Sequence, residues 1–419
     1  MRRSVISLAT FFFLAGFLLS NWAVRVPDAK IQVGATATAL GIALLCQSLG
    51  GLVSMAIGGR LCVRFGPRPV IVVAGPLTAL CVVGPTLAGS PTTLAMALML
   101  LGLVYGTFNI SLNSAAVELE RDLGTSVMSR LHGLYSCGAL AGALTGGGAA
   151  TTLGPTAHLA SVSVFGLVVI AALGRMLLSS APASGSGGAR GDGRTTRASA
   201  VRTSGVPAIT IVFAIIAFCT AFGEYSAIDW AALHLRVDVG ATAAAAAIGL
   251  ACYEGSMTIG RLAGDRMINR FGSTAVLGGG AVLALSGGLL AAWAPGGLTV
   301  AYIGYLMFGL GMANVFPIAI ARAGALAGPQ AVARVAMAST LGIMVERPVV
   351  GFLADVIGLP SALSLIAVLI ALIAVLGLMV RGQRAAAPVP DTDDTEDSTA
   401  DTGDSNASAE RNQQREHRA

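Results

Sequence analysis

Long hydrophobic stretches, each about the length of a membrane-spanning helix, recur along the chain and are separated by short polar segments. A helix needs about 20 predominantly apolar residues to cross a bilayer. This length predicts twelve spans, at roughly residues 5–23, 37–57, 70–88, 94–116, 131–152, 157–178, 208–232, 241–262, 274–293, 298–321, 332–357 and 360–380. The pattern therefore predicts an all-α membrane protein with twelve transmembrane helices.

Two polar segments divide these spans. Residues 179–205 are rich in Gly, Ser, Ala and Arg, a composition typical of a flexible linker. After Arg381 the chain is acidic and almost without apolar residues, so it cannot bury enough surface to order itself. We therefore expect a first six-helix bundle, a cytoplasmic linker, a second six-helix bundle and a disordered acidic tail, at residues 1–178, 179–206, 207–380 and 381–419.

The composition agrees with a membrane protein. Hydrophobic residues make up 55% of the chain and charged residues 11%, against roughly 25% charged residues in soluble domains. Basic residues concentrate in cytoplasmic loops of membrane proteins. With both termini in the cytoplasm, all but four of the 26 basic residues fall on that side; the exceptions are Arg25, Lys30, Arg236 and Arg347. This bias accounts for the net charge of +5 without a nucleic-acid partner.

The first hydrophobic run follows Arg2 and Arg3, as in a secretory signal peptide, but no small-residue cleavage site comes after it. We expect an uncleaved first helix.

Motifs of catalysis and metal binding are absent from the sequence. The four histidines form no HExxH pattern, no GxxxxGK[ST] loop occurs, and the six cysteines are scattered through apolar runs. We therefore expect no enzyme activity, no ATP-driven pumping, no metal and no cofactor.

The two halves of the chain repeat one motif. GGRLCVRFG at residues 58–66 aligns without a gap to GDRMINRFG at residues 264–272, after the second span of each half. Parallel six-helix halves are a known plan of secondary transporters. GRLCVRFGPR resembles the loop signature of the major facilitator superfamily, and NWAVRVP, FNISLNSAAVELER, MSRLHGLYSCGALAG, GEYSAIDWAALHLR and GLGMANVFP resemble a bacterial subgroup of mostly unassigned substrate.

This resemblance extends from Phe11 to Arg381. It implies two pseudo-symmetric six-helix bundles with a solute site between them, in a monomer that spans the bacterial plasma membrane. The family's loop carries an aspartate that latches the cytoplasmic side, where this chain has Val63 and, in the second copy, Asn269. Asp265 and Glu120 are candidates to replace it. The cytoplasmic gate implied by the resemblance comprises Arg64, Arg68, Glu120, Arg130, Arg261, Asp265 and Arg270.

The fifth span contains glycines from Gly138 to Gly147 that are similar to an exporter motif of the family, except that Ala143 replaces its proline. Close packing of helices explains the same glycines. The arginine that proton-driven drug exporters carry in the fourth span has no match here.

Glu254 lies in the middle of the predicted span 241–262, where a charge costs roughly 3 kcal/mol. Arg261 and Asp265 fall within about 20° of it on a helix, which indicates a polar face lining a cavity. Glu254 has three interpretations: a proton carrier, an ion pair with an arginine of a neighbouring helix, or a solute contact. Glu224 in the seventh span is a second candidate. Asp229 points about 140° away from it and is expected at the cavity or as an interfacial gate.

Asparagines in two other spans have two interpretations. Asn109 and Asn113 lie one turn apart in the fourth span, and Asn314 lies in the tenth, where we expect Pro317 to kink the helix. Their amides suit hydrogen bonds either to a polar solute or between helices.

Glu346 and Arg347 are adjacent in the eleventh span, so each needs a partner on another helix. Glu346 is a further candidate for proton coupling, and Arg347 for solute binding. Arg25, at the end of the first span, is expected either to contact a solute at the outer mouth or to lie on the outer surface.

The sequence therefore predicts a proton-coupled secondary transporter of a small organic solute, with export favoured. Uptake of a sugar-like or other polar solute is the alternative. A membrane sensor or assembly protein that binds partners through its acidic tail is a third interpretation.

Overall fold

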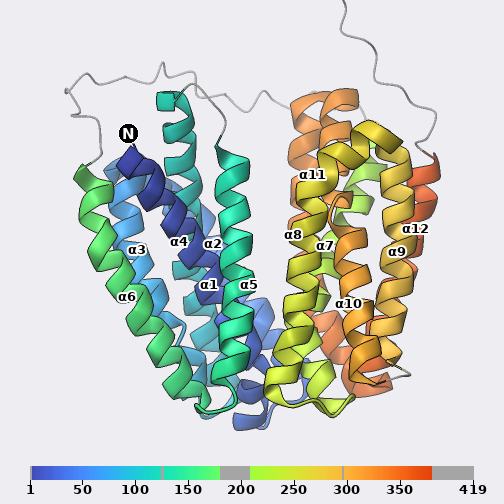
Figure 1. The fold of residues 1–419 in the computed structure, drawn as a ribbon, viewed down its shortest axis with the longest axis horizontal. Helices are drawn as coiled ribbons and strands as arrows, with labels where there is room; N and C mark the ends of the chain where they lie inside the picture. The colour runs from blue at the N-terminus through green and yellow to red at the C-terminus, as the bar shows by residue number, and fades with distance from the viewer. Residues whose placement is uncertain (1, 124–126, 180–207, 295–296, 380–419) are drawn as a thin grey trace, which may run out of the picture. The chain divides into compact units, whose positions relative to one another are not determined.

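The computed structural model describes residues 2–123, 127–179, 208–294 and 297–379, and within them it contains helices and connecting turns but no strand. The first half comprises α1 (Arg2–Gln32), α2 (Ala37–Phe65), α3 (Pro67–Cys81), the 3-10 turn η1 (Gly84–Leu87), α4 (Pro91–Leu123), α5 (Met128–Ala149) and α6 (Pro155–Ser179). The second half comprises α7 (Ala208–Val237), α8 (Ala243–Phe271), α9 (Ser273–Trp293), α10 (Leu298–Met312), α11 (Val315–Ile357) and α12 (Leu359–Met379). Figure 1 shows these helices running side by side. The predicted linker and tail lie almost wholly outside the described residues.

Nine helical segments of the described residues are long and apolar enough to cross a membrane. The other three predicted spans correspond to α5, α8 and the part of α11 after Gly328. A run of glycines lowers the hydropathy of α5, and charged residues lower that of α8 and α11. Of these three segments, α8 contains the candidate Glu254, and α11 contains the candidates Glu346 and Arg347.

The tenth and eleventh spans meet within α11. Helix α10 ends at Met312 and α11 begins at Val315, just before Pro317, which has no N–H to donate to the carbonyl four residues earlier. The break therefore lies three residues before the proline predicted to kink this span. A second bend occurs at Gly328, whose φ of 73° lies in the left-handed region that favours glycine. The tenth span thus runs over Leu298–Gly328, and the eleventh follows it inside α11.

The second helix of each half, α2 and α8, begins and ends with the same residue types at corresponding positions. Thr36 caps α2 by accepting a hydrogen bond from the Ala39 N–H, and Thr242 caps α8 in the same way. The other ends of α2 and α8 stop at Gly66 and Gly272, which have φ angles of 82° and 81°. These are the glycines that end the two copies of the repeated sequence motif, so the repeat is a repeat of structure.

The buried apolar side chains of both halves form one cluster, in which Phe11, Leu18 and Trp230 are fully buried. The halves contact each other mainly through α2 against α11 and α5 against α8. Glycines allow both pairs of helices to approach closely. A Cβ added at Gly41 would overlap the backbone of α11, and one added at Gly147 would crowd Ala247.

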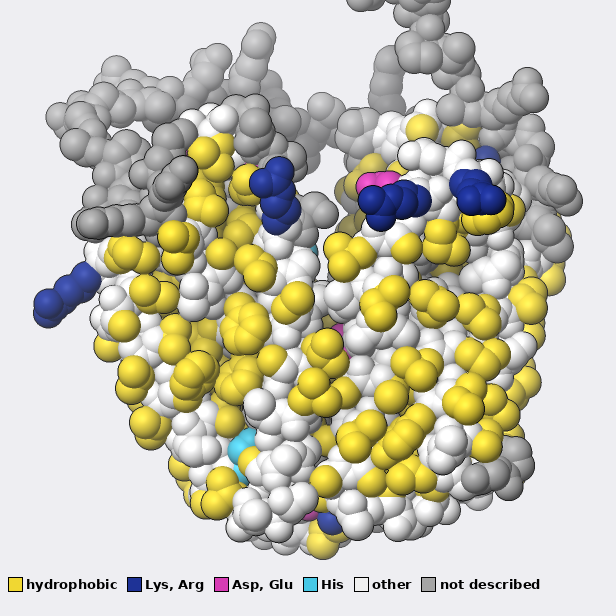
Figure 2. Space-filling model, viewed as in Figure 1, with side chains coloured by type: hydrophobic (Ala, Val, Ile, Leu, Met, Phe, Trp, Pro, Cys, Tyr) yellow, Lys and Arg dark blue, Asp and Glu magenta, His cyan; other side chains and the backbone are white. Residues whose placement is uncertain are grey.

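We call the end of the bundle where α2 and α8 stop at Gly66 and Gly272 the inner end, and the opposite end the outer end, following the topology predicted from the sequence. In Figure 2 hydrophobic side chains cover the middle of the visible face, and most Lys and Arg side chains gather toward its upper, inner end. This is the distribution expected of a helix bundle with an apolar band around its middle.

Candidate functional site

A cavity of about 210 Å³ lies where α1 and α5 of the first half face α7 and α8 of the second. Leucine, isoleucine, methionine, alanine and glycine residues form its apolar wall. Its polar lining consists of Ser20, Tyr135, Ser136, Glu224, Tyr225, Tyr253, Glu254 and Arg261. The sequence candidates Glu224, Glu254 and Arg261 are therefore brought together in one place.

The charges of this cavity do not balance. Arg261 on α8 lies 3.5 Å from Glu224 on α7, measured from nitrogen to oxygen, at the upper limit for a hydrogen bond. The second Glu224 oxygen is buried without a hydrogen-bond partner among the described residues. Glu254 also lines the cavity, and its carboxylate makes no ion pair with the residues that the structure describes. One guanidinium thus faces two carboxylates.

The ion pair is also loose. The side chain of Arg261 is 44% exposed, and pairs of this kind contribute at most about 1 kcal/mol in exposed settings. Because Arg261 is exposed, the wall of the cavity reaches the surface of the helix bundle at this residue. Arg261, which the sequence analysis predicts for the cytoplasmic gate, thus lies in the lining of the cavity beside Glu224.

The asparagine candidates do not line this cavity. Asn113 donates hydrogen bonds to the carbonyl and side-chain oxygens of Asn109, at 2.9 and 3.1 Å, and its own oxygen lies 3.0 Å from His132 Nε2. Asn314 donates to the Gly260 carbonyl at 2.9 Å. Asn113 and Asn314 thus make contacts between helices, to His132 of α5 and to Gly260 of α8, whereas the Asn109–Asn113 bonds lie within α4.

Arg347 forms a buried polar junction between the halves. Its Nε donates to Asp229 Oδ2 on α7 at 2.8 Å. One terminal nitrogen donates to the Leu44 carbonyl at 2.6 Å and to Ser48 Oγ at 2.9 Å, both on α2. Both charged side chains are almost fully buried. The position of Asp229 here, away from Glu224, agrees with the angle expected between them.

Glu346 lies next to this junction. It is fully buried, and one carboxylate oxygen accepts a hydrogen bond from Trp230 Nε1 at 2.7 Å. The other oxygen has no hydrogen-bond partner among the described residues. Glu346 and Arg347 thus find their partners on other helices, as their adjacency requires.

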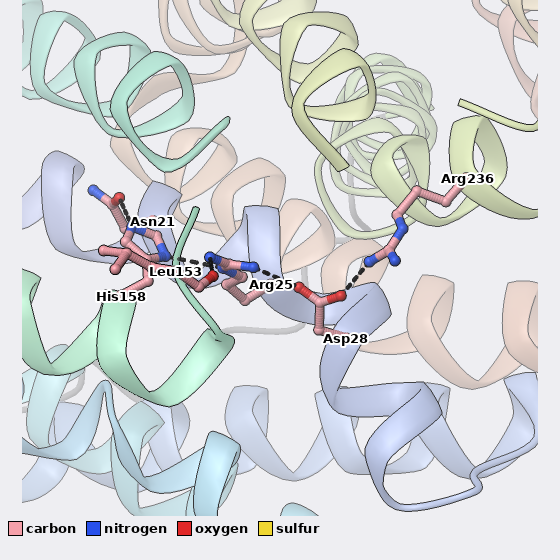
Figure 3. Close-up of polar contacts among 6 residues, drawn as sticks. All are labelled: Asn21, Arg25, Asp28, Leu153, His158 and Arg236. Carbon is pink, nitrogen blue, oxygen red and sulfur yellow. Dashed lines mark hydrogen bonds and ion pairs between the residues drawn. The ribbon is translucent and has the colours of Figure 1, made fainter. Parts of the chain in front are cut away.

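A third polar cluster joins the halves nearer the outer end. Arg25 is only 3% exposed and donates to His158 Nδ1 at 2.9 Å, to Asp28 at 3.0 Å and to the Leu153 carbonyl at 2.9 Å. Asp28 also pairs with Arg236 of α7. Because His158 Nδ1 accepts from Arg25, its Nε2 carries the proton and donates to Asn21 Oδ1 at 2.9 Å. Figure 3 shows Asp28 between the two arginines. Arg25 therefore lies neither in the solute cavity nor on the outer surface.

The outer end has one more contact between halves. The Asp355 carboxylate, near the end of α11, accepts hydrogen bonds from the N–H groups of Ala37 and Thr38 at 2.9 and 2.7 Å. Together with the Arg236 and Arg347 contacts, this closes the outer side of the cavity.

The remaining gate candidates occupy several different environments. Glu120 accepts hydrogen bonds from the N–H groups of Val127 and Met128 at 2.7 and 2.8 Å, which caps α5. Arg68 is buried and lies 3.9 Å from Asp122, an acid that sequence reasoning did not select. Asp122 stands at the end of a long helix, and no motif marks it. Arg130 and Asp265 are exposed, and Arg64 and Arg270 lie over the rings of the following phenylalanines.

Comparison with known proteins identifies the family. The Major Facilitator Superfamily matches this chain over residues 6–329 and again over residues 213–409. An uncharacterized MFS-type transporter of Yersinia pestis is 31% identical over 366 residues, which cover 86% of this chain and 91% of the relative. The uncharacterized transporter y4wD of Sinorhizobium fredii is 31% identical over 384 residues, covering 86% of this chain and 96% of that protein.

Solved structures show the same fold at low identity. The nucleoside transporter NupG aligns with a TM-score of 0.72 at 12% identity, over 92% of this chain and 100% of its own. A bacterial homolog of the human lysosomal transporter Spinster aligns with a TM-score of 0.68 at 14% identity, over 91% of this chain and 98% of its own. The expected twelve-helix fold is confirmed. The chain belongs to the major facilitator superfamily, and it is a multi-pass membrane protein and a secondary transporter rather than an enzyme.

Proposed function

We propose that this protein couples the movement of a small organic solute to that of protons, by alternating access to the cavity between α1, α5, α7 and α8. One observation carries the proposal: the cavity holds two carboxylates, and its guanidinium already contacts one of them. Glu254 is therefore the group that takes up a proton.

Protonation of Glu254 supplies the differential affinity that alternating access needs. An ionised Glu254 leaves the cavity with one net negative charge, and a protonated Glu254 makes it neutral. A proton shifts the equilibrium between two orientations only if it binds more tightly in one of them. The loose Arg261–Glu224 pair supports this role, because Arg261 can move toward whichever carboxylate is ionised.

Glu346 is a second proton site in this proposal. The buried acids Asp229 and Glu346 lie near one guanidinium, that of Arg347, which donates to Asp229 and not to Glu346. We expect the carboxyl of Glu346 to stay protonated while the outer end is closed. Separation of α2 from α11 would remove the Leu44 and Ser48 acceptors of Arg347 and free it for Glu346.

Export of a solute with an apolar body is the direction we propose. The apolar residues among the cavity lining support a solute with an apolar body, and the paired asparagines that favoured uptake of a sugar-like solute bond to one another and to His132 instead. The exporter-like glycines lend no further weight, because Gly138 and Gly147 are explained by close packing against neighbouring helices.

We propose that the protein is a monomer in the bacterial plasma membrane, with both termini in the cytoplasm. The bias of the basic residues supports this orientation. The cavity then faces the cytoplasm in this structure. Fluorescent fusions that report the location of each terminus test the topology.

Transport in proteoliposomes tests the mechanism. A thermal-shift screen of the purified protein against metabolite and antibiotic libraries supplies the solute. We expect Glu254→Gln to abolish accumulation driven by a pH gradient but to keep counterflow exchange. Glu118→Gln, the same change at a glutamate of α4 that does not line the cavity, is the matched control. Unchanged accumulation in Glu254→Gln would remove Glu254 from the mechanism.

The sign of the imposed gradient separates export from uptake. Absence of flux for every solute that binds would favour the sensor or assembly interpretation.

A further inference from the structure

Two apolar grooves lie at equivalent places in the two halves, away from the cavity between them. The first, of about 490 Å³, is lined by α2, α3 and α4, and the second, of about 330 Å³, by α8, α9, α10 and Asn314, which directly precedes α11. Their walls correspond through the sequence repeat, since Leu61 and Phe65 of the first match Met267 and Phe271 of the second. The two grooves are therefore related by the repeat that relates the two halves.

Both grooves open toward the outside of the bundle. In the first, Phe65 is 55% exposed and Val73 62% exposed, and in the second Phe271 is 59% exposed. The lining of the first is apolar except for Thr107, and that of the second except for Asn314, whose amide is bonded to the Gly260 carbonyl. In a membrane these surfaces face lipid.

Each groove has a cationic rim at its inner end. The guanidinium carbon of Arg64 lies 5.1 Å from the ring centre of Phe65, and that of Arg270 lies 5.5 Å from the ring centre of Phe271. Because both rings line grooves, these cation–π contacts hold the arginines beside the groove mouths.

Two further exposed arginines, Arg60 and Arg266, lie one turn earlier at equivalent positions. Positions 63 and 269, where the family's loop carries an acid, hold Val63, which is 91% exposed, and Asn269. Neither residue repels an anion.

We propose that each groove binds one acyl chain of an anionic phospholipid, whose headgroup phosphate lies against Arg64 in the first half and Arg270 in the second. A long apolar cleft below a pair of arginines matches a molecule with a hydrocarbon chain and an anionic head. A zwitterionic lipid fills the same groove but gains less from the arginines. The exposed Asp265 adds one carboxylate near the second rim, so the first groove binds the anionic lipid more tightly.

Native mass spectrometry of the full-length protein tests the proposal with equimolar phosphatidylglycerol and phosphatidylcholine of identical acyl chains. We expect wild-type protein to retain up to two phosphatidylglycerol molecules in preference to phosphatidylcholine. Each of Arg64→Gln and Arg270→Gln should lower that preference about fivefold at its groove, the ratio that corresponds to one arginine near an anionic lipid. Arg64→Lys keeps the charge and should keep the preference. The double variant Arg121→Gln/Arg175→Gln removes exposed arginines that border neither groove and is the control.

Variants that fill the grooves test the position of the acyl chain. Val73→Phe occupies the first groove, and Gly279→Leu the second, where a Cβ meets open space. Both should reduce retention of both lipids while the thermal unfolding midpoint stays unchanged. Equal retention of the two lipids by wild type, or unchanged preference in Arg64→Gln/Arg270→Gln, would overturn the proposal. So would full retention in the filled variants, or a dimer that Val73→Phe dissociates.

Discussion

The buried contact between Arg347 and Asp229 gives a prediction with a definite magnitude. Both side chains are less than one-tenth exposed, and Nε lies 2.8 Å from the carboxylate. Replacing Arg347 with Met leaves the Asp229 charge buried without its partner, and removing one member of a buried pair costs about 3–5 kcal/mol. We therefore expect Arg347→Met to lower the free energy of unfolding by about 3–5 kcal/mol.

A double-mutant cycle separates the ion pair from packing. In Arg347→Met/Asp229→Asn no uncompensated charge remains at this pair, so the double variant should recover at least half of the loss. Arg236→Met is the matched control, because Arg236 also joins the halves, but without it Asp28 keeps Arg25 as a partner, so the loss should cost only about 1 kcal/mol. Reversible unfolding in mixed micelles with increasing SDS gives the free energy of unfolding of five proteins: the wild type, the single variants Arg347→Met and Asp229→Asn, the double variant and Arg236→Met. The reasoning fails if Arg347→Met and Arg236→Met are equally stable, or if the two single losses simply add.

Four further substitutions test the closure of the outer end and the helix caps. Asp28→Asn weakens the contact with Arg236, so cysteines placed at the outer side of the cavity should react faster with aqueous maleimide; an unchanged rate would contradict this. Gly41→Leu inserts a side chain where α2 meets the α11 backbone, so the unfolding midpoint should fall clearly, and a wild-type midpoint would show that the helices can separate without loss. Thr36→Ala and Thr242→Ala should each cost about 1 kcal/mol in SDS titration, and a large inequality between them would show that the two caps are not equivalent.

Much of the fold could be predicted from the sequence because it depends on local composition. The apolar runs locate the helices, and the repeated motif locates Gly66 and Gly272, where both halves turn. The boundary between the tenth and eleventh spans is harder to predict, because α11 continues through both of them and only Gly328 departs from helical φ and ψ angles. A hydropathy window cannot find such a boundary.

The candidate site could be predicted only in part. Helical periodicity places Glu254 and Arg261 on one face, and both line the cavity. Periodicity cannot say which neighbouring helix a face meets. The acceptors of Arg25 and Asn314 were therefore out of reach, since His158 lies 133 residues from Arg25, and the partner of Asn314 is a backbone carbonyl. Every residue has a backbone carbonyl, so the residue type does not indicate which carbonyl accepts a hydrogen bond.

The Asp355 contact determines how the outer end can open. Its carboxylate holds the N–H groups of Ala37 and Thr38, which belong to the first turn of α2 and have no acceptor within their own helix. Thr36 separately satisfies the next free donor, that of Ala39. Withdrawal of α11 would therefore break only these two hydrogen bonds at the end of α2. Water can then accept from the N–H groups of Ala37 and Thr38, and every hydrogen bond within the helix is kept. Opening at this point is a rigid-body release that requires no local unfolding.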